Sequence, residues 1–171
     1  MSFADKVSLL HPFGQPFTDD VGASVQTQFD FSEETTQLAS SLKAVIPMFE
    51  FARSASSANS SSGQVMQLCF VISDARLDSD NRASLQTLIR EMTEQHILVV
   101  LVILDLNENK SDSILATKSV EFTPAGKVIT RSYLDNFPFP YYLAIQQVEA
   151  LPDILVDTIK QWFELVSIQS K

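Results

Sequence analysis

The sequence has few of the features that accompany secretion, membrane insertion or nucleic-acid binding. Only one of its 171 residues is a cysteine, Cys69, so no disulfide can form within the chain. The chain has 12 basic and 21 acidic residues, and the resulting net charge of −9 opposes binding to a phosphate backbone or an anionic membrane. The longest apolar run, Ile97 to Leu104, is far shorter than the roughly 20 residues of a spanning helix. We therefore expect no direct nucleic-acid or membrane partner, and the first residues resemble no secretion or transit signal.

Common catalytic and cofactor motifs are also absent. The chain has no G-x-x-x-x-G-K-[ST] loop, no G-x-G-x-x-G fingerprint and no G-x-S-x-G elbow. His11 and His96 lie far apart, and neither belongs to a zinc-binding pattern. Cys69 stands inside an apolar run, which is typical of an inert core thiol. The sequence thus predicts no phosphate cradle, no zinc site and no activated serine.

What the sequence does contain is an alternation of strand and helix patterns. Strands are expected over residues 3–10, 65–73, 97–104 and 141–146, with a further short strand at 25–31. Helices are expected from 32 to about 49, from about 79 to 92 and from 151 to 166, where apolar residues recur at helical spacing. The continuous apolar runs at 65–73 and 97–104 are typical of strands that are covered on both faces. This order predicts a Rossmann-like α/β domain with a mostly parallel sheet and helices on both faces.

Residues 1–171 are expected to form a single domain with two irregular segments. Residues 54–63 are rich in serine and predict a flexible surface loop. Residues 107–132 predict a loop and hairpin insertion, which is either a second contact surface or a solvated excursion. Pro47 is expected to kink the helix that contains it or to end its regular part.

Two aspartates follow the predicted buried strands. Asp74 comes directly after one, and Asp105 comes directly after the next. In an open α/β sheet, ligands bind outside the carboxyl ends of the strands. A carboxylate there, with hydroxyl groups nearby, suits Mg²⁺, which prefers oxygen ligands and retains several waters. The alternative is that each aspartate caps a helix or forms a turn, which is the commoner role for this residue after a strand.

Specific blocks of sequence carry a resemblance to a known family. They are residues 2–13, 70–76, 103–105, 110–115, 131–142, 150–155 and 161–166. The run Leu-Leu-His-Pro-Phe at 9–13 and the run Phe-Pro-Phe-Pro-Tyr-Tyr at 137–142 are the most specific of these. Together they resemble a von Willebrand factor A-type domain with a metal-ion-dependent adhesion site, as found in a very large dynein-like ATPase of ribosome assembly.

The resemblance implies a protein-interaction module. In such domains Mg²⁺ is held near the positions that Thr36 and Asp74 occupy here, and an acidic side chain of the partner completes its coordination. Arg76 and Asp78 stand where a partner would touch, and their alternative role is helix capping. The family's D-x-S-x-S motif does not occur in this chain. We therefore expect a domain that is truncated at its N-terminus and that lacks its first strand.

The implied partners are ubiquitin-like domains of pre-60S assembly factors and the remainder of the large ATPase, in the nucleus. The resemblance also implies that this chain is not itself an enzyme, because it lacks the ATPase modules. An alternative is a small Mg²⁺-dependent phosphoryl-transfer enzyme, for which Asp105 is the spare candidate base or nucleophile. A second alternative is an inactive fragment.

Overall fold

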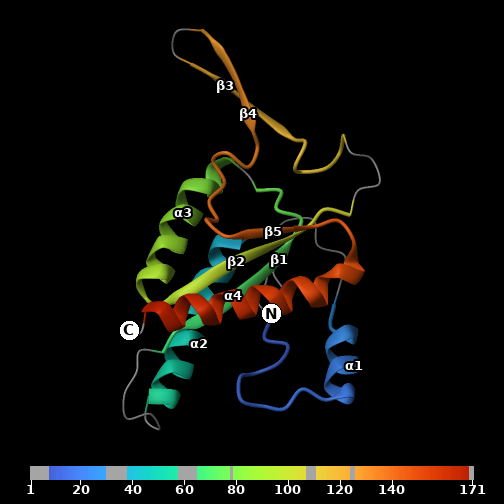
Figure 1. Cartoon of the computed structure of the whole chain (residues 1–171), viewed down its shortest axis with the longest axis vertical. Coiled ribbons are helices and arrows are strands. Elements are labelled where there is room, and N and C mark those ends of the chain that lie inside the picture. Colours follow the sequence, from blue (N-terminus) through green and yellow to red (C-terminus); the bar gives the residue numbers. More distant parts are fainter. Residues whose placement is uncertain are drawn as a thin grey trace.

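The computed structural model of the chain describes residues 8–29, 38–57, 65–77, 79–106, 111–123 and 126–169 (Figure 1). Its elements are α1 (Asp19–Thr27), α2 (Leu38–Ser57), β1 (Gln67–Ser73), α3 (Ser79–Glu94), β2 (Ile97–Leu104), β3 (Lys118–Phe122), β4 (Val128–Ser132), β5 (Tyr142–Ile145), the short 3₁₀ helix η1 (Val148–Ala150) and α4 (Leu151–Gln169). The predicted α/β architecture is confirmed.

Strands β1, β2 and β5 form a parallel sheet in the order β1-β2-β5. Gln67 pairs with Ile97 at one end of the β1–β2 ladder, and Ser73 pairs with Ile103 at the other. Because all three strands run the same way, their carboxyl ends share one edge of the sheet. Asp74 and Asp105 therefore leave the sheet at that edge, as expected from the sequence.

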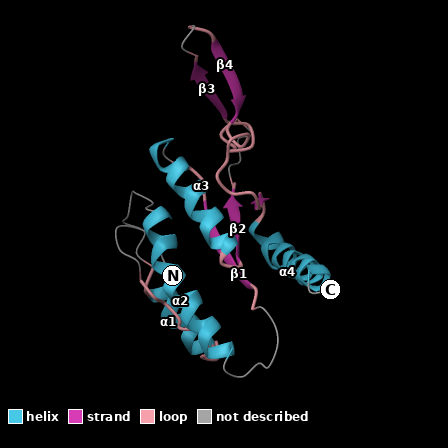
Figure 2. Cartoon of the chain, turned by 90° about the vertical axis from the view of Figure 1, so that its left-hand side faces the viewer, coloured by secondary structure: helices cyan, strands magenta, loops and turns pink. Residues whose placement is uncertain are grey.

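Helices cover both sides of this sheet. Helices α2 and α3 lie on one side and α4 lies on the other (Figure 2). The core between the sheet and the α2–α3 layer is apolar and includes Leu42, Phe49, Leu85, Met92, Val71, Val99 and Leu101. On the other face of β2, Val100 and Val102 are also buried. The central strand is thus covered on both faces, which explains its uninterrupted apolar sequence.

Strand β1 is less covered than its sequence suggests. Val71 is fully buried, but the neighbouring Ile72 is 48% exposed. Among the described strands, β1 pairs only with β2 and so stands at an edge of the sheet. The expectation that both faces of β1 are covered is therefore wrong at Ile72.

Helix α2 confirms the predicted apolar face, since Leu38, Leu42, Val45 and Phe49 are all buried. Pro47 does not end the helix, which continues to Ser57. Its missing N–H removes one helical hydrogen bond, but burial of the apolar residues on either side outweighs that loss. Residues 54–57 are consequently helical rather than loop, and residues 58–63 of the predicted serine-rich loop lie outside the described residues.

The N-terminal segment differs from the prediction. The short strand expected over residues 25–31 is wrong for 25–27, which belong to α1, and for 28–29, which are not in a strand. Residues 30–31 lie outside the described residues. Thr18 caps this helix, because its hydroxyl accepts a hydrogen bond from the Val21 N–H at 3.4 Å. Local capping and two acidic residues in the first turn decide the helical structure. Of the strand expected over 3–10, residues 3–7 lie outside the described residues. Ser8 makes an isolated β-bridge, and Leu9 and Leu10 are not in a strand.

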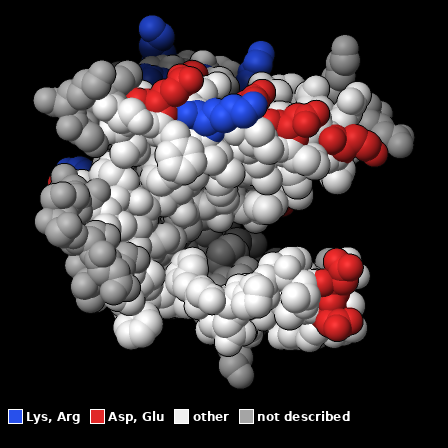
Figure 3. All heavy atoms as spheres, turned by 60° about the horizontal axis from the view of Figure 1, so that its bottom comes forward, with Lys and Arg blue, Asp and Glu red and all other residues white. Residues whose placement is uncertain are grey.

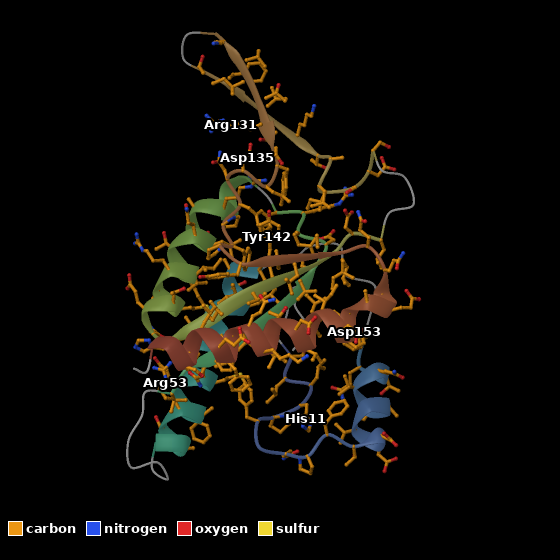
Figure 4. The ribbon with its side chains drawn as sticks, viewed as in Figure 1. His11, Arg53, Arg131, Asp135, Tyr142 and Asp153 are labelled. Carbon is orange, nitrogen blue, oxygen red and sulfur yellow. The ribbon has the colours of Figure 1, made fainter. Side chains whose placement is uncertain are left out.

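Two side chains join α2 to the amino edge of the sheet. The buried Gln67 side chain accepts a hydrogen bond from the Arg53 guanidinium at 2.9 Å and donates one to the Phe49 carbonyl at 2.8 Å. Arg53 also donates to the backbone carbonyl of Gln95. Figure 4 shows Arg53 at the opposite end of the molecule from the β3–β4 hairpin. This network satisfies the polar atoms that burial of Gln67 would otherwise leave unpaired.

Helix α4 forms as predicted, but its apolar face is poorly covered. Of the expected face Leu155, Ile159, Trp162, Phe163 and Val166, none is buried, and Phe163 is 58% exposed. A three-stranded sheet is narrow, so it offers this long helix little apolar surface. Among the described residues, no helix is both long and apolar enough to cross a membrane.

Candidate functional site

The first candidate residue, Asp74, stands in a tight turn directly after β1. Its Oδ1 atom accepts a hydrogen bond from the Arg76 N–H at 3.2 Å, and the Ser73 hydroxyl lies 3.4 Å from the same atom. Its Oδ2 atom lies 4.0 Å from Nε of Arg76, and both side chains are about two-thirds exposed. Asp74 thus forms the turn with one oxygen, while the other lies beside the Arg76 guanidinium at the carboxyl edge of the sheet.

The next residue of this turn is held in an unusual backbone conformation. Ala75 is completely buried and has a φ of +60°, in the left-handed region where residues with a Cβ are disfavoured. The Tyr133 hydroxyl donates a hydrogen bond to the Ala75 carbonyl at 3.0 Å and accepts one from the Leu77 N–H at 2.8 Å. The Arg82 guanidinium lies 4.2 Å from the centre of the Tyr133 ring. Tyr133 therefore fixes the segment Asp74–Leu77, which we call the Asp74 loop.

Asp105, the second aspartate, has a different environment. It is 4% exposed, and its carboxylate accepts hydrogen bonds from the Ser113 hydroxyl and from the Ile114 N–H, the latter at 3.3 Å. The Ser113 hydroxyl also accepts a hydrogen bond from the Leu115 N–H at 3.2 Å. Asp105 is therefore a turn-forming residue that orders residues 113–117. The alternative interpretation of this aspartate as a turn former is confirmed.

The Asp74 loop and the turn at 113–117 form the walls of a cleft of about 290 Å³. Its lining residues are Arg76, Leu77, Ile114, Thr117 and Tyr133. The Arg76 guanidinium reaches across to the Asp112 carbonyl at 3.4 Å. The cleft places the Arg76 guanidinium beside Asp74, and a cation at this edge suits an acidic side chain from a partner.

The structure places only part of the predicted site. Asp74 and Arg76 lie side by side in one loop, whereas Thr36 and Asp78 lie outside the described residues. Within the ranges that the structure describes, no group of three or more His, Cys, Asp or Glu side chains is arranged to hold a metal. Asp74 and Ser73 supply hard oxygen atoms that suit Mg²⁺, but a single carboxylate predicts weak binding.

Sequence reasoning missed the residues that shape this site. Tyr133 and Ala75 are 58 positions apart in the chain, and no local pattern connects them. Arg82 was likewise not identified, although it lies on α3 directly after the loop. The run Ser111-Asp112-Ser113 was a usable signal, because serine and aspartate clusters commonly form side-chain-to-backbone turns.

The fold and the loop define the class of protein: an α/β domain whose parallel sheet presents an exposed aspartate at its carboxyl edge. No model of a known protein family matches the chain. The chain does match midasin. It is 33% identical over 164 residues to midasin from Dictyostelium discoideum, and 32% identical over 171 residues to midasin from Giardia intestinalis.

These two matches cover 95% and 98% of the chain, respectively. The chain spans about 3% of the length of each of these proteins. The resemblance inferred from the sequence blocks is therefore confirmed as a match to a small part of midasin.

Proposed function

We propose that the chain is a protein-interaction module of the midasin kind, with a von Willebrand factor A-type fold, that acts in assembly of the large ribosomal subunit in the nucleus. In this proposal it binds ubiquitin-like domains of pre-60S assembly factors and works as one part of a longer protein. The match to midasin along nearly the whole chain supports the assignment. Catalysis by ATP hydrolysis belongs, in this proposal, to other parts of such a protein.

The observation that carries the proposal is the position of Asp74. Its carboxylate stands at the carboxyl edge of a parallel sheet, and its side chain is 60% exposed. Mg²⁺ bound there, with Thr36 as a second ligand, would bridge to a carboxylate of the partner. Because Mg²⁺ keeps several waters, one or two protein ligands and one from the partner suffice to form such a bridge.

The enzyme alternative gains no support from the second aspartate. Asp105 is buried, and its carboxylate is occupied by Ser113 and Ile114. A general base or nucleophile needs an oxygen within reach of substrate. We therefore propose no phosphoryl-transfer activity for Asp105.

The test is an affinity measurement with an isolated ubiquitin-like domain of a pre-60S assembly factor, made in Mg²⁺ and in EDTA. We expect binding to be about tenfold or more tighter in Mg²⁺. Asp74→Ala should abolish that difference. Asp157→Ala is the matched control, because Asp157 is a similarly exposed aspartate on α4, with 68% of its side chain accessible.

A second arm uses the same chain preceded by a strand that carries D-x-S-x-S. This extended chain should bind Mg²⁺ more tightly than the 171-residue chain, because the motif adds oxygen ligands. Equal affinity for the partner in Mg²⁺ and in EDTA, in both proteins, refutes the proposed metal bridge.

A further inference from the structure

Contacts from three other parts of the chain hold Tyr133 in place beside the Asp74 loop. Its N–H donates a hydrogen bond to the Thr117 carbonyl at 3.0 Å. Its ring lies 4.2 Å from the Arg82 guanidinium and 6.1 Å, centre to centre, from the ring of Phe137. None of these contacts involves the Asp74 loop, so the position of the Tyr133 hydroxyl is set independently of the loop that it binds.

Ala75 is the residue of the loop that depends most on this hydroxyl. Its φ of +60° is disfavoured for any residue with a Cβ, so the turn needs support from outside. The Tyr133 hydroxyl lies 3.0 Å from the Ala75 carbonyl, 2.8 Å from the Leu77 N–H and 3.3 Å from the Leu77 carbonyl. These hydrogen bonds stabilise the left-handed turn, and without them Ala75 favours a right-handed or extended conformation.

The conformation of Ala75 in turn determines how the Asp74 carboxylate is held. The Arg76 N–H donates to Oδ1 of Asp74 at 3.2 Å, and Ala75 lies between these two groups in the chain. The Ala75 N–H itself donates to the Ser73 hydroxyl at 3.2 Å. A different Ala75 conformation would move the Arg76 N–H away from Oδ1, and the carboxylate would lose its fixed orientation at the edge of the sheet.

The charges around this loop suit the acidic partner of the proposed function. Nε of Arg76 lies 4.0 Å from Oδ2 of Asp74, and Arg82 adds a second cation beside Tyr133. The bottom of Figure 1, which faces forward in Figure 3, instead carries acidic side chains on two lobes beside a hollow. An acidic surface is therefore attracted to the loop and repelled from that other end of the molecule.

We propose that Tyr133 is a positioning residue for the partner-binding site, because its hydroxyl orients the Asp74 carboxylate through the left-handed turn at Ala75. This inference rests on the proposed function for the identity of the partner and of the metal. It assigns Tyr133 a role in binding that is separate from its contribution to the stability of the fold.

The experiment measures the affinity for the same ubiquitin-like domain in Mg²⁺ and in EDTA, and we call the ratio of the two affinities the Mg²⁺ gain. Tyr133→Phe should reduce the gain from about tenfold to about threefold or less, because the carboxylate is no longer held toward the metal. Adding Ala75→Gly to Tyr133→Phe should restore most of the gain, since glycine adopts a positive φ without support from the hydroxyl. Tyr141→Phe is the matched control, because Tyr141 is 50% exposed.

A second readout needs neither metal nor partner. Hydrogen exchange in EDTA at the Arg76 amide reports the bond to Asp74, and exchange at the amides of β2 reports opening of the whole fold. Tyr133→Phe should accelerate exchange at Arg76 by a larger factor than in β2, and the added Ala75→Gly should reverse that excess. An equal acceleration at both places would mean that the tyrosine only stabilises the fold.

The outcomes separate this proposal from the proposed function. If Tyr133→Phe keeps the full Mg²⁺ gain, the positioning role is overturned and the metal bridge stands. If the gain is lost and Ala75→Gly does not restore it, the turn is not the route of the effect and the positioning role is again overturned. Should Tyr133→Phe fail to fold, a folded double variant with a restored gain supports the role, and a double variant that is unfolded or lacks the gain overturns it. No Mg²⁺ gain in the unaltered chain overturns both proposals.

Discussion

The hydroxyl group of Tyr133 donates a hydrogen bond to the carbonyl of Ala75 across 3.0 Å, although the two residues are 58 positions apart in the chain. The same hydroxyl accepts the Leu77 N–H at 2.8 Å, so it satisfies backbone groups on both sides of Arg76. One side chain from the root of the hairpin thus determines the shape of the loop that presents Asp74.

Removing this hydroxyl should destabilise the chain and loosen the loop. We expect Tyr133→Phe to lower the free energy of unfolding by about 1–3 kcal/mol, because the part-buried hydrogen bonds of this hydroxyl to Ala75 and Leu77 are lost. Urea denaturation measures the loss, and hydrogen exchange at the Leu77 amide measures the loosening. Tyr141→Phe is the control, since Tyr141 is 50% exposed. A change in Tyr133→Phe no larger than in the control would contradict this role.

Ala75 should accept glycine far better than valine. Glycine removes the strain of the left-handed backbone conformation, but it also removes a buried methyl group. These opposing effects leave the free energy of unfolding within about 1 kcal/mol of that of the unaltered chain. Valine adds volume at a fully buried position and is strongly disfavoured at positive φ, so Ala75→Val should cost about 2 kcal/mol or more. Thermal and urea unfolding of the two variants test the difference. Equal stability of the two variants would show that the turn is not constrained as described.

Replacing Asp105 by alanine should lower the free energy of unfolding much more than replacing Asp74. Asp105→Ala leaves the Ser113 hydroxyl and the Ile114 N–H without their buried acceptor, and we expect a loss of about 2–4 kcal/mol. Asp74→Ala should cost less than about 1 kcal/mol, because that side chain is 60% exposed. Denaturant unfolding of both variants is the measurement. A larger loss for Asp74→Ala would reverse the assignment of structural and surface roles.

Cys69 should react slowly with thiol reagents in the folded chain. Burial raises the pKa of its thiol from 9.0 to about 11. Because the folded state holds this proton more tightly, the thiol's contribution to stability is complete below pH 9 and is lost as the pH rises through 11. The rate of alkylation by iodoacetamide should therefore reach its midpoint near pH 11 in buffer and near pH 9 in urea. A midpoint near pH 9 in the folded chain would contradict the burial of this thiol.

Much of the fold was predictable because it depends on local periodicity. The spacing of Leu38, Leu42, Val45 and Phe49 specifies the buried face of α2, and the apolar run of β2 specifies a strand covered on both sides. Asp74 and Asp105 could be assigned to one sheet edge because parallel strands end together. The helix α1 was missed because a single cap at Thr18 outweighs the strand preference of Val25.

The site itself was predictable only in part. Asp74 and Arg76 follow from their position after β1, whereas the roles of Tyr133, Arg82 and Ser113 depend on contacts between distant parts of the chain. The sequence also could not distinguish the exposed Asp74 from the buried Asp105, since both follow an apolar strand. Their difference arises from the turn at 113–117, which folds over one aspartate and leaves the other open.

Tyr133 directly follows β4, so a force on the hairpin of β3 and β4 reaches the Asp74 loop through Tyr133. Force on this hairpin acts on the Asp74 loop through the hydrogen bonds of the Tyr133 hydroxyl, before it acts on the hydrogen bonds between β1 and β2. These few bonds would rupture first under tension on the hairpin, so the Asp74 loop would deform while the sheet stayed intact.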